Sequence, residues 1–164
     1  MKTVFTGDHV LVIERDDWQY VERKRGKESV AVIAETDDGL VILTEQFRRP
    51  VNARVIDWPA GLVGDDDPSI SADDTAKKEL EEETGYVCKT VERLAKGPSS
   101  PGITSEIVTL YRARGVTRKG KGGGVDGEDI TVHAIPRREL KSWLGKQTAM
   151  IDLKVWGGLY FLSS

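Results

Sequence analysis

The sequence is short of cysteine, and this excludes two kinds of structural feature. The 164 residues include one cysteine, Cys88, so an internal disulfide and a thiolate metal site are both excluded. We expect Cys88 to be a small core residue rather than a reactive thiol. Aromatic residues make up 7% of the chain, while 38% of it is hydrophobic and 31% charged. This balance is typical of one globular domain with a core of its own.

Long apolar runs and an excess of positive charge are also missing. The longest apolar stretches, 30–34 and 40–43, are far shorter than the roughly 20 residues that span a bilayer, so we expect no membrane segment. Residues 1–8 turn polar before the core of a signal peptide could develop, and we therefore expect a cytoplasmic protein. The formal net charge of −3 argues against unspecific binding of nucleic acid.

Short β-branched runs alternate with turn-forming residues along the chain. The runs predict strands at 29–35, 40–46, 54–58, 106–113 and 130–135. Apolar periodicity predicts helices at 71–84, 137–146 and 152–162. We therefore expect an α+β fold with helices packed around a sheet. The glycine- and lysine-rich patch 119–124 is compatible with a solvated linker, a mobile lid or a nucleic-acid contact.

The predicted helix 71–84 has clear ends. Ser71 can cap its N-terminus, and Gly85 can adopt the left-handed turn that ends it. Its apolar residues recur at every fourth position and form a narrow stripe that we expect to face the sheet: Ala72, Ala76 and Leu80.

Four carboxylates crowd into residues 79–83 of this helix. Glu79 and Glu83 stack on one face, where like charges repel unless a cation lies between them. Carboxylate ligands suit Mg²⁺ or Mn²⁺. Glu82 lies further round the helix and could be a third ligand or could orient the others. A solvated acidic face would give the same run of residues, so the run alone leaves both interpretations open.

Residues 78–86, KELEEETGY, resemble the second half of the signature motif of the Nudix hydrolases, R-E-U-x-E-E-x-G-U, in which U is a bulky apolar residue. Lys78 replaces the arginine. Residues 58–61, WPAG, resemble the start of the motif in members that act on ADP-ribose and nucleotide sugars. The connection between Gly61 and Lys78 is about three residues longer than usual. Spacing would put the first glutamate of the motif, which supports this loop, at Ile70 or Asp67.

Four further segments resemble that nucleotide-sugar branch and occur in the expected order: 18–23 (WQYVER), 44–51 (TEQFRRPV), 99–106 (SSPGITSE) and 127–132 (GEDITV). The resemblance implies a Nudix fold, an α/β/α sandwich with the acidic helix on one face of a mixed central sheet. It also implies a small N-terminal β segment at 1–28, which would form a dimer, and a hydrolase domain at 29–164.

The resemblance assigns roles to individual residues. The metal ligands would be the backbone carbonyl of Ala60 with Glu79, Glu83 and Glu128, and the catalytic residues would be Glu82, Glu83 and Glu128. We take Glu128 as the general base, with Asp126 and Glu106 as alternatives. Arg23 and Arg48 would contact the substrate phosphates, and Trp18 would stack on the base. The remaining substrate-binding residues would be Gln46, Pro101, Gly102 and Glu106.

The implied activity is Mg²⁺-dependent, or alternatively Mn²⁺-dependent, hydrolysis of the pyrophosphate bond of a nucleoside diphosphate sugar. ADP-ribose is the first choice, with GDP-mannose and other nucleotide sugars as alternatives. The family also implies a homodimer that exchanges N-terminal segments, so that Trp18 and Arg23 serve the partner's site.

Three rival functions need different features. A Nudix hydrolase that removes damaged nucleoside triphosphates would need neither the Gln46 segment nor the Pro101 loop. A non-catalytic sensor of nucleotide sugars would be expected to lose the glutamates of the motif. An RNA-binding or decapping protein would draw on the basic stretch 118–121, which is poor support in an acidic chain.

Overall fold

A mixed sheet forms the centre of the protein in the computed structural model, which describes residues 1–26, 28–65, 67–125 and 127–162. Its strands are β4 (Glu28–Thr36), β5 (Leu40–Arg48), β6 (Ala53–Asp57), β7 (Ala60–Leu62), β8 (Tyr86–Val87), β9 (Thr90–Pro98), β10 (Ile107–Arg118), β11 (Ile130–Pro136) and β12 (Met150–Ile151). They run in the order β12-β6-β5-β4-β10-β8, and β11 pairs with β5, β7 with β4 and β9 with β10.

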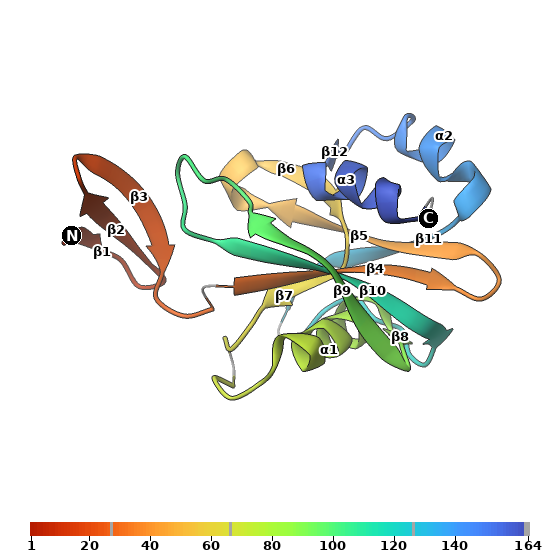
Figure 1. Ribbon diagram of the computed structural model, residues 1–164. Helices are drawn as coiled ribbons and strands as arrows, with labels where there is room; N and C mark the ends of the chain where they lie inside the picture. Colours follow the sequence, from red (N-terminus) through yellow and green to blue (C-terminus); the bar gives the residue numbers. More distant parts are fainter. Residues whose placement is uncertain (27, 66, 126, 163–164) are drawn as a thin grey trace.

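Helices cover both faces of this sheet, as expected for an α/β/α sandwich. Figure 1 shows α1 (Ala72–Thr84) on one face and α2 (Leu140–Leu144) and α3 (Leu153–Leu162) on the other. Two short 3-10 helices, η1 (Arg49–Val51) and η2 (Arg137–Glu139), follow β5 and β11. None of the described helices has the length and apolar character needed to cross a membrane.

The central strands are buried on both faces, which explains their nearly continuous apolar sequences. Residues 30–34 of β4 are almost completely inaccessible, and β4 runs parallel to β10 and antiparallel to β5. On the α1 face, Ala76 and Leu80 pack against Val30, Ile42 and Val116. On the opposite face, a second core gathers buried residues of the sheet, of the β6–β7 connection and of α2 and α3: Leu43, Ile56, Trp58, Leu144 and Val155.

Helix α1 begins and ends where the sequence predicts. The Ser71 hydroxyl accepts a hydrogen bond from the backbone N–H of Asp74, and Gly85 ends the helix with φ of 73°. Ala76 and Leu80 are fully buried and Ala72 partly, so the predicted apolar stripe does face the sheet.

The predicted strands and the two C-terminal helices are also present, with shifted ends. β10 continues to Arg118 instead of ending at residue 113, because Gly115, at φ of 65°, allows a shift in its pairing with β4. The short strands β7, β8 and β12 and the longer β9 were not predicted. β9 is an outer strand with many exposed polar residues, and its sequence therefore lacks a clear apolar alternation.

The N-terminal residues form a separate antiparallel sheet of β1 (Lys2–Thr6), β2 (Val10–Arg15) and β3 (Trp18–Arg23). This N-terminal sheet extends away from the central sheet (Figure 1). Its backbone is tied to the 99–106 loop, since the Val21 N–H donates to the Ile103 carbonyl at 2.8 Å and the Ser105 N–H to the Val21 carbonyl at 3.1 Å. Val4, Phe5 and Trp18 on this sheet are exposed.

Candidate active site

A cavity of about 870 Å³ opens beside the acidic face of α1. Strand β7, the end of β5, β12 and the start of α3 all contribute residues to its lining. The cavity brings together most of the residues that the sequence predicts for the site: Arg23, Gln46, Arg48, Ala60, Glu79, Glu82, Glu83, Glu106 and Glu128.

Glu83 is the most buried carboxylate of the cavity, with 6% of its surface exposed. One carboxylate oxygen, Oε2, accepts a hydrogen bond of 3.0 Å from the backbone N–H of Ala60. Burial, together with the negative charges of Glu79 and Glu128, raises the pKa of Glu83 to about 8 against the opposing effects of the Ala60 N–H and Arg48. A bound cation would therefore be needed to keep Glu83 ionised at neutral pH.

Glu79 lies directly against Gly61. A Cβ atom on Gly61 would overlap the carboxyl group of Glu79, so only glycine lets this carboxylate approach the backbone of β7. The side chains of Glu79 and Glu83, one helical turn apart on α1, thus both meet the Ala60–Gly61 backbone. This contact explains why a glycine follows Ala60 in the predicted motif.

The donor set fits a hard divalent cation. Carboxylates and a backbone carbonyl are the ligands that Mg²⁺ and Mn²⁺ take, and the cluster of Glu79, Glu83 and Glu128 is electrostatically costly without a cation. In the described part of the chain, no three His, Cys, Asp or Glu side chains form a group that could hold a metal by themselves. Mg²⁺ commonly binds through one or two carboxylates plus water and substrate phosphates, so a full protein cage is not required.

Lys78 occupies the position of the arginine in the motif. Its ammonium group lies 3.2 Å from Glu82 Oε2, one turn further along α1. In the long loop before the helix, Asp67 Oδ1 accepts hydrogen bonds from the backbone N–H and the hydroxyl of Ser69, at 2.8 and 2.6 Å. This local turn orders the loop at one of the two positions where spacing would put the missing glutamate.

Two arginines from other elements line the same cavity. Arg48 lies at the end of β5, and its charge opposes the rise in the pKa of Glu83. Arg23, at the end of β3, forms an ion pair of 3.3 Å with Glu106, whose other oxygen accepts a hydrogen bond from the Ser99 hydroxyl. The cavity therefore has an acidic side that suits a cation and guanidinium groups that suit an anion.

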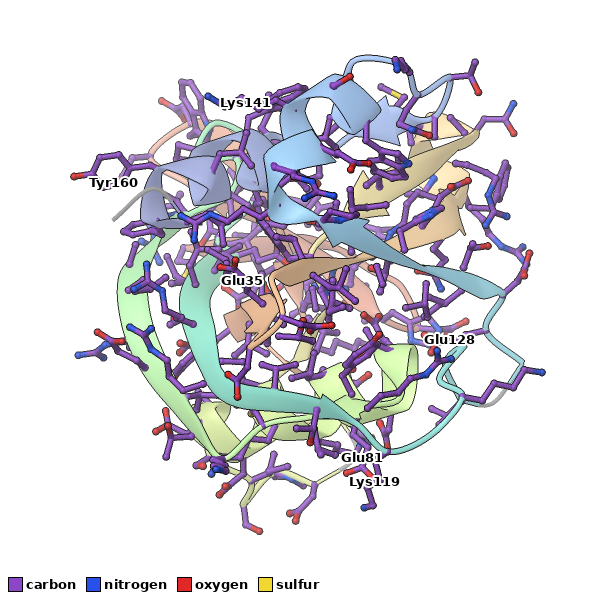
Figure 2. The ribbon with its side chains drawn as sticks, turned by 90° about the vertical axis from the view of Figure 1, so that its right-hand side faces the viewer. Glu35, Glu81, Lys119, Glu128, Lys141 and Tyr160 are labelled. Atoms are coloured by element: carbon purple, nitrogen blue, oxygen red, sulfur yellow. The ribbon has the colours of Figure 1, made fainter. Side chains whose placement is uncertain are left out.

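Glu128 lies at the rim of the cavity and is exposed. Figure 2 shows it on the segment that joins β10 to β11. The backbone N–H of Val125 donates to Glu128 Oε2 at 3.2 Å. Asp126, the first alternative for the general base, falls outside the described residues.

Three predicted substrate-binding residues do not line this cavity. Trp18 lies at the tip of the β2–β3 hairpin with 62% of its surface exposed. Pro101 and Gly102 are exposed in the turn that precedes Ile103. Any contact of these residues with a ligand in the cavity would require movement or a second molecule.

Sequence reasoning missed a charged triad that lines the cavity. Lys154 Nζ lies 2.9 Å from Asp57 Oδ2 and 2.8 Å from Asp152 Oδ2. Burial raises the pKa of Asp57 to about 6, with Asp152 adding to the effect and Lys154 opposing it. No local motif indicates this triad, because β6 and α3 are far apart in the sequence.

Comparisons with known proteins show which family the chain resembles. The NUDIX domain model matches residues 25–152. A methanol dehydrogenase activator from Bacillus methanolicus is 35% identical over 135 residues, which are 77% of this chain and 70% of the relative. A GDP-mannose pyrophosphatase from Cronobacter sakazakii is 30% identical over 140 residues, 77% of this chain and 71% of the relative.

An ADP-ribose pyrophosphatase from Bacillus subtilis is 41% identical over 86 residues, 52% of this chain but only 44% of the relative. Among solved structures, an ADP compounds hydrolase has a TM-score of 0.67 at 20% identity, and the match covers 88% of this chain and 80% of that one. This structural likeness shows the fold alone. The family model covers most of the chain, and two of these relatives match over more than two thirds of both chains, so the protein belongs to the Nudix family of hydrolases.

Proposed function

We propose that this protein hydrolyses the pyrophosphate bond of nucleoside diphosphate sugars and releases a nucleoside monophosphate and a sugar phosphate. The observation that carries the proposal is the meeting, in one cavity, of the α1 carboxylates with Arg23 and Arg48. A diphosphate has the charge and size to bridge the two groups. The volume of about 870 Å³ lies in the upper part of the range of small-molecule sites, which suits a whole nucleotide sugar.

Nudix hydrolases depend on divalent metal ions, and we propose Mg²⁺ here, with Mn²⁺ as the alternative. Glu79, Glu83, Glu128 and the carbonyl of Ala60 would hold the metal. When bound, a divalent ion neutralises phosphate charge and makes a water molecule more acidic.

The chain's own groups would bind the substrate and move the proton. The guanidinium groups of Arg48 and Arg23 can each form charge-assisted, bidentate hydrogen bonds with phosphate oxygens, and Glu106 holds Arg23 in position. The carboxylate of Glu128 would accept the proton of the attacking water, while the Val125 N–H orients one of its oxygens. Glu82, paired with Lys78, would keep the acidic face of α1 ordered.

ADP-ribose is our first choice of substrate, and GDP-mannose is the alternative. The names of the relatives, ADP-ribose pyrophosphatase and GDP-mannose pyrophosphatase, support a nucleotide sugar without choosing between the two. Gln46 lines the cavity and would contact the sugar or base.

Trp18, Pro101 and Gly102 would contact the base only in a homodimer, which we also propose. We place the protein in the cytoplasm, where a thiol such as that of Cys88 stays reduced.

The test is product release from ADP-ribose, UDP- and GDP-sugars, diadenosine compounds and nucleoside triphosphates, with magnesium and then with chelator. We expect magnesium-dependent formation of a nucleoside monophosphate and a sugar phosphate. Activity on triphosphates alone would favour the rival hydrolase, and no turnover of any compound would favour a sensor.

A further inference from the structure

The glycine-rich segment 119–125, here called the glycine loop, lies across the C-terminal end of α1. The Lys119 N–H donates to the Gly85 carbonyl at 2.8 Å, the Gly123 N–H to the Glu83 carbonyl at 2.8 Å and the Gly124 N–H to the Glu82 carbonyl at 3.1 Å. Carbonyls in the last turn of a helix have no partner within the helix. The glycine loop supplies partners for them, so it is docked on the helix and is neither a solvated linker nor a free lid.

Side chains at the start of the glycine loop add to this docking. Lys119 Nζ lies 2.7 Å from Glu81 Oε1, and Figure 2 shows the two side chains together below the ribbon. The neighbouring guanidinium group of Arg118 lies 5.8 Å from the centre of the Tyr86 ring, just beyond the helix end. The glycine loop is therefore held to α1 at both the backbone and the side-chain level.

Two glycines allow the close approach. Gly122 has φ of 69°, and a Cβ atom there would overlap the Thr84 carbonyl and lie 2.6 Å from the backbone nitrogen of Gly85. Gly124 has φ of 85°, and its Cβ atom would lie 2.6 Å from both the Cβ and the Oε2 of Glu128. At both positions any other residue meets backbone strain and a steric overlap.

We propose that the glycine loop positions Glu128 relative to the α1 carboxylates, with Gly124 as the positioning residue. Gly124 donates to the backbone of α1 at Glu82 and is in contact with the side chain of Glu128. The next residue, Val125, donates to the Glu128 carboxylate. A series of contacts thus joins the helix that would hold the metal to the group that would take the proton. The catalytic part of this inference rests on the proposed function.

The first test compares two glycine-to-alanine variants with matched backbone strain. Gly124→Ala introduces an overlap with Glu128, whereas Gly39→Ala, in the β4–β5 turn at φ of 82°, has nothing within 4 Å of its new methyl group. We expect Gly124→Ala to lower kcat by roughly 10- to 100-fold with KM changed less than about twofold, since a shift of 1 Å at a catalytic group has an effect of this size. We expect Gly39→Ala to keep the wild-type kcat. Equal kcat values for the two variants would overturn the proposal.

The second test asks whether Gly124 acts through Glu128. In a Glu128→Gln background the shape of the side chain is kept but the general base is lost, so Gly124→Ala should lower kcat no further. Independent, multiplicative losses in this double-mutant cycle would show that Gly124 acts elsewhere.

The docking itself has a readout that needs no activity. By NMR-detected hydrogen exchange, the amides of Gly123 and Gly124 should exchange about as slowly as those of α1, and Gly122→Ala should accelerate them. Fast exchange in the wild-type protein would refute the docking. A protein that turns over no nucleotide but shows this protection would instead refute the proposed function and leave the docking in place.

Discussion

At the scale of a single residue, the ionisation of the buried Glu83 carboxyl group depends on a bound metal. Its carboxyl group is buried, it accepts the Ala60 N–H, and its pKa is raised to about 8 chiefly by burial. Without a cation the group is mostly protonated at neutral pH. A divalent ion in the cluster would displace that proton, so metal binding and the ionisation of Glu83 are coupled.

We therefore predict that Glu83→Gln lowers turnover by about 100-fold or more and weakens the response to magnesium. The amide keeps the shape of the side chain but cannot become an anion. Magnesium should raise the melting temperature of the wild-type protein and of a surface control, Glu92→Gln. It should raise the melting temperature of Glu83→Gln much less. Calorimetry with added magnesium and then with chelator measures this. An unchanged magnesium response in Glu83→Gln would remove the residue from the ligand set.

The ionisation of Asp57 makes the stability of the protein, rather than its turnover, depend on pH. Its pKa is raised from 3.8 to about 6, mainly by burial, so the folded protein binds a proton that the unfolded chain releases. The stabilisation is complete below about pH 4 and is lost as the pH rises through about 6.

The prediction concerns the difference in stability between the wild-type protein and Asp57→Asn, whose neutral side chain does not titrate. From pH 4.5 to 7.5 the wild-type free energy of unfolding should fall relative to the variant by about 2 kcal/mol. Urea unfolding at several pH values measures this difference, with the exposed Asp37→Asn as the control. A difference that does not depend on pH would contradict the assignment.

At the scale of elements, α1 was predictable because its signals are local. Ser71, Gly85 and the apolar stripe all lie within the helix or next to it, and the structure confirms each of them. Strand β12 and strand β7 are short, and each exists because a distant partner, β6 or β4, completes its hydrogen bonds. No periodicity can develop in such short segments, so sequence patterns could not predict them.

The residues of the candidate site also fall into two groups, those that local sequence predicts and those that it does not. Residues in recognisable segments, such as Arg48, Glu79 and Glu128, were found from the sequence and meet in one cavity. The Asp57–Lys154–Asp152 triad and the docking of the glycine loop were missed, because each depends on contacts between distant parts of the chain.

Helix α3 packs against Trp58, which lies between β6 and β7. The Trp58 indole N–H donates to the Lys154 carbonyl at 2.9 Å, and a Cβ atom on Gly158 would lie 2.5 Å from that indole nitrogen. Gly158 is buried, whereas the adjacent Gly157 is exposed, and a methyl group placed on it would have no other atom within 4 Å.

Alanine variants of Gly158 and Gly157 make a matched pair of tests. Gly158→Ala should destabilise the protein by about 1–3 kcal/mol through overpacking against Trp58. Gly157→Ala should be neutral or stabilise by up to about 1 kcal/mol, because alanine favours a helix. Chemical denaturation of both variants decides the matter, and a stable Gly158→Ala protein would show that Trp58 can move aside.

At the scale of the whole molecule, the N-terminal sheet leaves apolar side chains uncovered. Val4, Phe5 and Trp18 are exposed, and Trp18 lies outside the lining of its own cavity. Arg23 does line that cavity, so the structure places it at the site of its own chain. A homodimer formed through this sheet would cover these apolar residues.

We predict a homodimer in sedimentation experiments, and we expect Phe5→Glu to dissociate it and lower activity. Tyr160→Glu is the control, because Tyr160 is 75% exposed on α3 and projects away from the molecule in Figure 2. Dissociation by Tyr160→Glu alone would move the interface to α3. A wild-type monomer with full activity would rule the dimer out.

The hydrogen bonds and the ion pair between the N-terminal sheet and the 99–106 loop have a thermodynamic consequence. Arg23 ends the last strand of that sheet, yet it pairs with Glu106 inside the cavity, and Val21 is bonded to the same loop. If ligand binding at Arg23 and the association of two such sheets are coupled through these contacts, each changes the affinity of the other by the same factor. If two such sheets associate, the apparent dissociation constant of the substrate will depend on the concentration of the protein itself.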